Sequence, residues 1–191
     1  MNESVLKELE CFLENPSPEN FLRLRAATAA TKDYLPYGRK PEEVGEFLAR
    51  GDFSRAQATL VALMPGYFLN PGIHTLLSFI RHKLGDEAGA GVEFDFGVSF
   101  LSGILSTGDG DEIHPYQVLY VNDEYDVLEH LSKKSHSQSL VSEGHRMLDR
   151  HDCEDGAKVW FDITTPYSAL VRGLANGQPS KSIEGQAWQP V

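Results

Sequence analysis

The chain has 191 residues, of which 41% are hydrophobic and 24% are charged, and its formal net charge is −11. This balance is ordinary for a soluble globular protein, and the length suits one domain or two small units that share a core. The acidic excess argues against a general nucleic-acid binder and against attachment to an anionic membrane surface, because both need clustered lysine and arginine. The acidic excess is compatible with a basic protein as the partner.

Two features of the chain bear on its compartment. The first twenty residues lack the basic region and the uninterrupted apolar run of a secretory signal, and no apolar run reaches the length of a membrane-spanning helix. The two cysteines, Cys11 and Cys153, are too few for a disulfide framework. We therefore expect a cytoplasmic protein that neither enters a membrane nor binds nucleic acid.

Apolar residues at helical spacing characterise the first half of the chain. One stripe runs from Val5 to Leu13 and ends at the sequence NPSP, where Ser17 and Pro18 have the residue types of an N-cap and a first helical position. The next stripe is broken by LPYGRKP, and Pro41 begins a third helix with an acidic first turn. The pattern predicts three helices before residue 50.

An internal repeat follows these helices. Gly-Asp follows an apolar helix at Gly51 and again at Gly85, 34 residues later (85 − 51 = 34). The matched positions at this offset are Gly51 with Gly85, Ala56 with Ala90, and Leu60 with Phe94. This period is that of the tetratricopeptide repeat, in which a glycine ends one helix, a small residue admits the next, and a large apolar residue fills the groove. The alternative is a generic pair of antiparallel helical hairpins.

The second half of the chain has a different character. The run YQVLYV (116–121) predicts a strand covered on both faces, and Asn122 and Asp123 predict the cap of a short helix. Two further strands flank a hairpin turn at Asp155-Gly156, while the segment SHSQS (135–139) has the composition of a loop. Thr165 and Pro166 open a last helix.

These patterns predict an α+β fold. We expect antiparallel, tetratricopeptide-like helical hairpins over residues 1–107, packed against a small, mainly antiparallel three-stranded sheet with short helices over residues 108–174. The two parts form one compact unit. Residues 175–191 have loop composition and are expected to be a mobile tail, in which Trp188 either docks on the domain or contacts a partner.

The order of motifs in the second half resembles that of a bacterial family of unknown function. The segments that carry the resemblance are GDGDEIHPYQVLYVNDEYDVLEHL, SQSLV and KVWFDITTPY. In that family a Ser-Gly-Asp-Gly-like turn precedes a strand, an acidic helix and a closing FDI strand, with tetratricopeptide-like sequence upstream. The resemblance covers roughly residues 40 to 170, and Thr107 stands where a serine is common. It implies a helical part packed on a small α+β element, and no enzyme activity.

The acidic turn after the repeat is the first candidate for a metal site. Asp109, Asp111 and Glu112 offer oxygen ligands to a hard cation. However, Ile113 breaks the alternation of an EF-hand, and no Gly-Lys-Ser/Thr follows as in a P-loop. The favoured interpretation is a turn, in which the glycines supply positive φ and the aspartates bind turn amides.

The second candidate is the predicted strand that ends at Cys153. Asp149, His151 and Cys153 would point to one side of a strand, which makes a transition-metal site an alternative. We favour polar side chains on the solvent face of an edge hairpin, and the acidic neighbours of Cys153 disfavour a nucleophilic thiolate. His74 and His82 are eight residues apart, which is not a zinc spacing. The short helix that begins at Asn122 presents Asp126, Glu129 and His130 as a charged outer face.

These residues favour a non-catalytic protein-interaction module that needs no cofactor. Paired helices form a concave groove, and the aromatic residues expected beside it as anchors are Tyr34, Tyr37, Tyr67 and Phe68. Two alternatives remain. One is an immunity-type or antitoxin-like inhibitor of a basic toxin, and the other is a metal-dependent hydrolase that uses the acidic turn or the His151 and Cys153 hairpin.

Overall fold

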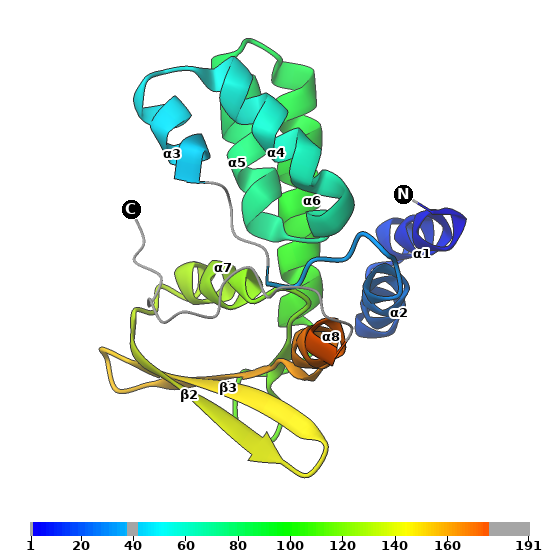
Figure 1. Ribbon diagram of the computed structural model, residues 1–191, viewed down its shortest axis with the longest axis vertical. Helices are drawn as coiled ribbons and strands as arrows, with labels where there is room; N and C mark the ends of the chain where they lie inside the picture. The colour runs from blue at the N-terminus through cyan, green and yellow to red at the C-terminus, as the bar shows by residue number, and fades with distance from the viewer. Residues whose placement is uncertain (1, 38–41, 176–191) are drawn as a thin grey trace.

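A computed structural model describes residues 2–37 and 42–175, which form an α+β fold with helices in the N-terminal part and a sheet at the C-terminal side (Figure 1). The helices are α1 (Glu3–Glu14), α2 (Pro18–Ala29), α3 (Glu42–Ala49), α4 (Phe53–Tyr67), α5 (Pro71–Lys83), α6 (Glu87–Leu105), α7 (Asn122–His130) and α8 (Thr164–Ala175). The strands are β1 (Tyr116–Gln117), β2 (Ser135–Glu143), β3 (Arg146–Cys153) and β4 (Lys158–Asp162). Trp188 lies outside the described residues.

Side-chain caps set the starts of five helices. In each case the residue before the helix accepts a hydrogen bond from the amide three positions later, which satisfies one of the free N–H groups of the first turn. The capping residues are Asn2, Ser17, Asp52, Asn70 and Asp86. The cap and first helical position predicted at Ser17 and Pro18 are confirmed.

The 34-residue repeat corresponds to two helix-turn-helix units, α3 with α4 and α5 with α6. Both glycines of the repeat adopt a positive φ, 71° at Gly51 and 81° at Gly85, in the turns that join the helices. Ala56 is buried, as a close helix contact requires. The match fails at Phe94, because this side chain is 57% exposed while its counterpart in the first unit is fully buried. The groove-filling role expected for Phe94 is therefore wrong.

The helical hairpin α1–α2 packs beside the lower part of α6 (Figure 1). Phe12 and Phe21 contact each other with ring centroids 5.5 Å apart, and both are buried. Phe21 lies against Gly103 of α6, where a Cβ atom would come within 3.0 Å of three ring carbons. Gly103 is thus required by the close approach of the ring.

The sheet has four strands in the order β1-β4-β3-β2, rather than the three expected. It is mixed, because β1 runs parallel to β4 while the other pairs are antiparallel. The predicted strand over residues 116–121 is regular only at Tyr116 and Gln117, since Asp123 accepts the amide hydrogens of Leu119 and Tyr120 and turns the chain into α7.

The segment predicted as a loop at residues 135–139 is instead the first part of β2. Strand β2 pairs along its length with β3, so backbone hydrogen bonds stabilise a segment whose polar side chains give little strand signal. Its side chains are mostly exposed, as suits an edge strand. The hairpin predicted at Asp155-Gly156 is confirmed between β3 and β4, with φ of 84° at Gly156.

Strand β3 is central rather than at the edge, which overturns the expected solvent exposure of its polar residues. Asp149, His151 and Cys153 share one face and are 7%, 0% and 2% exposed. Strands on both sides of β3 hold it away from the sheet edge, and contacts with α7 cover His151. The polar row that the sequence places in solvent is therefore in the interior.

Aromatic residues join the helical part to the sheet part. Tyr120 stacks on Tyr67 with ring centroids 5.2 Å apart and meets Tyr34 edge-on at 5.8 Å. Arg25 of α2 donates hydrogen bonds to the carbonyl of Val118 next to this cluster. One hydrophobic core thus runs through both parts of the described chain.

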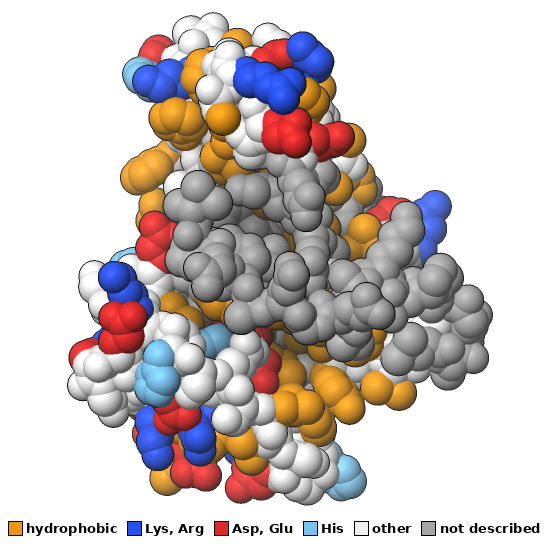
Figure 2. Space-filling model, turned by 60° about the vertical axis from the view of Figure 1, so that its left-hand side comes forward, with side chains coloured by type: hydrophobic (Ala, Val, Ile, Leu, Met, Phe, Trp, Pro, Cys, Tyr) orange, Lys and Arg blue, Asp and Glu red, His pale blue; other side chains and the backbone are white. Residues whose placement is uncertain are grey.

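Helix α6 alone among the described helices is long and apolar enough to cross a membrane by length and composition. The core helix of a globular protein passes the same test, and α6 packs along α5 with Phe100 and Ile104 buried. Figure 2 shows acidic and basic side chains interspersed on one face of the molecule, with apolar side chains reaching the surface among them.

Candidate functional site

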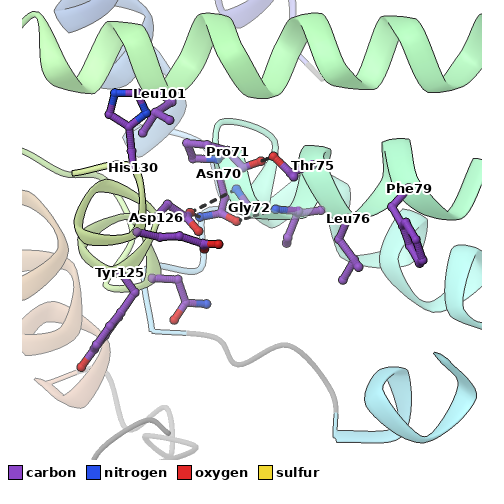
Figure 3. A pocket seen from close by; sticks show the side chains of 13 residues that line it. Asn70, Pro71, Gly72, Thr75, Leu76, Phe79, Leu101, Tyr125, Asp126 and His130 are labelled. Atoms are coloured by element: carbon purple, nitrogen blue, oxygen red, sulfur yellow. Dashed lines mark hydrogen bonds between the residues drawn. The ribbon is translucent and has the colours of Figure 1, made fainter. Parts of the chain in front are cut away.

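A pocket of about 440 Å³ lies between α5, the C-terminal part of α6 at Leu101, and α7 (Figure 3). We call it the α5–α7 pocket. Its lining residues are Asn70, Pro71, Gly72, Ile73, Thr75, Leu76, Phe79, Leu101, Asn122, Tyr125, Asp126, Glu129 and His130. The lining is mainly apolar and aromatic, and its charged groups are the carboxylates of α7.

Asn70 positions the polar end of the pocket. Its side-chain oxygen caps α5 by accepting the amide hydrogen of Ile73 at 2.9 Å. Its side-chain nitrogen donates to Asp123 Oδ1 at 2.8 Å and to Asp126 Oδ2 at 3.0 Å. One buried amide group therefore both begins α5 and joins that helix to two carboxyl groups of α7.

Asp126 lies against the start of α5. Its Oδ2 accepts a second hydrogen bond from the Gly72 amide at 3.1 Å, one of the free N–H groups of the first helical turn. A Cβ atom at residue 72 would come within 3.0 Å of Asp126 Oδ1, so only glycine leaves room for that oxygen. The charged outer face predicted at Asp126 is thus wrong for this residue, although Glu129 and His130 are exposed as expected.

Burial makes the carboxyl groups at the polar end of the pocket weaker acids than usual. Burial, together with the negative charge of Asp123, raises the pKa of Asp126 to about 7, although the hydrogen bonds from Gly72 and Asn70 oppose this shift. Burial likewise raises the pKa of Asp123 to about 6. No lysine or arginine lines the pocket among the described residues, whereas Arg25, outside the lining, lowers the pKa of Asp123 in opposition to its burial.

This arrangement is suited to binding a cation. Asp126 Oδ1 accepts no hydrogen bond within the described part of the chain, while Oδ2 accepts two. A carboxyl group whose pKa lies near neutral pH, in a largely apolar cavity, readily loses its proton when a positively charged ligand binds. Apolar cavities with a few convergent polar groups are typical of binding sites.

A second buried polar group joins α7 to the sheet. His151 Nε2 lies 2.8 Å from Glu124 Oε2, and His151 Nδ1 lies 2.9 Å from Ser135 Oγ. The order serine, histidine, acid is that of a hydrolase triad. However, burial lowers the pKa of His151 to about 4 and raises that of Glu124 well above its ordinary value. An uncharged acid beside such a weakly basic imidazole does not stabilise the imidazolium that triad chemistry requires.

The other histidine expected near the helical repeat is also part of the interior. His74 is 1% exposed, with Nδ1 2.7 Å from Glu93 Oε2 and Nε2 2.7 Å from the carbonyl of Phe68. Both ring nitrogens therefore have partners. His82, two turns later, is exposed beside Glu87.

The acidic turn lies in solvent. Asp109, Asp111 and His114 are exposed, and one ligand atom from each lies within 4.8 Å of the others. Asp111 Oδ1 accepts the amide hydrogens of Ile113 and His114 at 2.9 and 2.6 Å, which accounts for its position as part of the turn. Gly110 has a φ of 73°, as expected of a turn glycine.

Cys153 is separate from this turn and faces the sheet interior. Its thiol is buried, and burial together with Asp155 raises its pKa, as the acidic sequence context predicts. The metal ligands considered from the sequence, Asp109 and Asp111 on one side and His151 and Cys153 on the other, thus lie in opposite environments, one in solvent and one in the core.

The aromatic residues expected as groove anchors have mainly structural contacts. Tyr67 is 2% exposed, Tyr34 donates a hydrogen bond to the carbonyl of Leu119, and Phe68 packs against His74. Tyr37 is half-buried, and burial raises its pKa. The pocket uses other residues, whose sequence signal was the Asn70-Pro71 helix start and the acids of α7.

Comparisons with known proteins place no relative beside this chain: no family model, no curated protein and no solved structure matches it.

Proposed function

We propose that this protein is a non-catalytic interaction module that binds a basic segment of a partner protein in the α5–α7 pocket. The observation that carries the proposal is the composition of the pocket. Its apolar lining from α5 and α6 ends at carboxyl groups of α7, with no lysine or arginine among the described lining residues.

The size of the pocket supports a side chain as the ligand. A volume of about 440 Å³ falls within the range of small-ligand sites and admits one or two side chains of a bound peptide. Phe79, which is 46% exposed, and Leu76 extend the apolar lining along α5. A partner segment that carries an apolar residue beside a basic one matches both halves of this surface.

The charge of the whole chain supports a basic partner. A formal net charge of −11 accelerates encounters with a positively charged protein and discourages acidic ones. The negative net charge also favours the more specific function of an immunity-type inhibitor that neutralises a basic toxin. That function predicts a basic toxin as the captured partner, whereas a general adaptor captures partners with no toxic activity.

Affinity capture with a blocked pocket tests the proposal. Thr75→Trp places an indole at the pocket, and Val92→Trp places the same group at a side chain of α6 that is 55% exposed and lies outside the pocket lining. Proteins from the native host retained by the wild type and by Val92→Trp, but lost with Thr75→Trp, would be identified by mass spectrometry. Circular dichroism of both variants checks that they fold. Equal retention by Thr75→Trp would contradict the proposal.

A further inference from the structure

The carboxylate of Asp126 has unequal oxygens. Oδ2 accepts hydrogen bonds from Asn70 and from the Gly72 amide, while Oδ1 accepts none from the described residues. The absence of a side chain at residue 72 leaves room for Oδ1 itself, because a Cβ atom there would come within 3.0 Å of this oxygen. Asp126 is held in place by one oxygen and presents the other as a single acceptor.

We propose that Asp126 Oδ1 binds the ammonium group of a lysine side chain that enters the α5–α7 pocket. This inference rests on the proposed function, because it assigns the chemistry of the partner residue that the pocket receives.

The geometry favours lysine over arginine. A guanidinium group binds best to both oxygens of a carboxylate, through two parallel hydrogen bonds. Asp126 offers only one free oxygen, which suits the compact charge of an ammonium group. Leu76 and Leu101 line the approach and match the apolar stem of a lysine, which buries its methylene groups while its charge finds a partner.

The charges around Asp126 also favour a cation. Asp123 and Glu129 of the same helix both act on Asp126 as negative neighbours. Helix α5 faces it with the neutral Asn70 and Gly72, and α6 contributes the apolar Leu101 to the lining. His130 stands exposed at the rim. An ammonium group therefore replaces a proton on Asp126 and meets no positive side chain of α5 or α6 in the pocket.

Binding is consequently expected to weaken in acid. Between about pH 8 and about pH 6, the ionised fraction of a carboxyl with a pKa of about 7 falls about tenfold. The affinity for an ammonium ligand falls by the same factor. Burial of the cation lowers the pKa of Asp126, so binding releases protons at neutral pH.

Titration of the full chain with n-butylammonium, followed by ¹H–¹⁵N NMR, tests the assignment. We expect the amide resonances of Gly72, Ile73 and Asp126 to shift in a saturable way, with weaker shifts for N-butylguanidinium and none for n-butanol. Asp126→Asn should abolish the shifts. Asp95→Asn, which removes one exposed carboxylate of α6 outside the pocket, should retain them. Gly72→Ala places a Cβ atom within 3.0 Å of Oδ1, which displaces this oxygen without a change of charge, and should also abolish them.

The outcomes separate the two proposals. Equal responses to n-butylammonium and n-butanol, or retention of the shifts by a folded Asp126→Asn variant, would overturn the lysine assignment. If Thr75→Trp still abolished partner capture in that case, the proposed function would stand without it. If n-butylammonium bound at Asp126 while the Thr75→Trp variant still captured the partner, the ammonium site would stand and the proposed function would fail.

Discussion

Replacing Glu124 with glutamine tests whether the buried pair between α7 and β3 retains a proton above the ordinary pKa of a glutamic acid. The side chains of Glu124 and His151 are both 0% exposed, and the two interacting atoms lie 2.8 Å apart. Burial raises the pKa of Glu124 and lowers that of His151 to about 4. The pair is therefore a carboxylic acid that donates a hydrogen bond to an imidazole nitrogen. Glutamine preserves the shape and the donor but binds no additional proton.

The pH dependence gives the prediction its magnitude. Above about pH 4.5, the ordinary pKa of a glutamic acid, the unfolded chain releases a proton that folded Glu124 retains. The wild type therefore loses stability relative to Glu124→Gln as the pH rises toward the folded pKa. While folded Glu124 stays protonated, the difference in the free energy of unfolding grows by about 1.4 kcal/mol per pH unit.

Urea unfolding followed by circular dichroism, between about pH 5 and about pH 8, measures this difference. Taking the difference between the variant and the wild type removes the contributions of Asp123 and Asp126, whose carboxyl groups are common to both. Glu129→Gln, at an exposed carboxyl of the same helix, controls for the loss of one negative charge. If the difference stayed flat, or if the wild type gained stability relative to the variant as the pH rose, Glu124 would be ionised beside an uncharged His151, and the proton assigned to Glu124 would be refuted.

Four further substitutions test the packing and the hydrogen bonds. Gly103→Ala should destabilise the fold by about 1 to 3 kcal/mol, because its Cβ would press on Phe21, whereas Gly91→Ala in open space on the same helix should stabilise it by about 0.5 to 1 kcal/mol. Thermal unfolding of the pair compares them, and equal effects would contradict the close contact. Asp123→Ala leaves two buried amides of the preceding loop unpaired and should cost about 2 to 4 kcal/mol in urea unfolding. Tyr34→Phe, which removes one hydrogen bond to the same loop, should cost only about 1 kcal/mol in that assay. A larger loss of stability for Tyr34→Phe than for Asp123→Ala would contradict this ranking.

Local chemistry made part of the fold predictable. Positive φ at Gly51 and Gly85 and the hairpin at Gly156 depend on a few adjacent residues, and the sequence signals them directly. The capping residue Ser17 is of the same kind. Such features are fixed by steric limits on the backbone or by a single side-chain hydrogen bond, so they need no knowledge of the distant chain.

Features that depend on distant partners were missed. Strand β2 has polar side chains and acquires its strand conformation from pairing with β3. The burial of His151 depends on Glu124, which lies 27 residues away, and the pocket depends on Asn70 and Asp126, which lie 56 residues apart. A polar residue beside a buried partner looks in the sequence like a polar residue in solvent. The candidate site therefore could not be inferred from motifs, although the carboxylates that form it were visible as charged residues.

The parallel pairing of β1 with β4 has a consequence for folding order. Tyr116 pairs with Phe161, so β1 has no partner until 45 more residues (161 − 116 = 45) have left the ribosome. The helices of the N-terminal part contain mostly local contacts and can form during this interval, while the sheet closes last. Until β4 arrives, Tyr116 lacks the ring of Phe161, which lies 6.0 Å from it in the finished fold, and the amide of Val118 lacks the carbonyl of Asp162. Chaperone dependence during synthesis is thus expected to centre on this short segment rather than on the helical repeat.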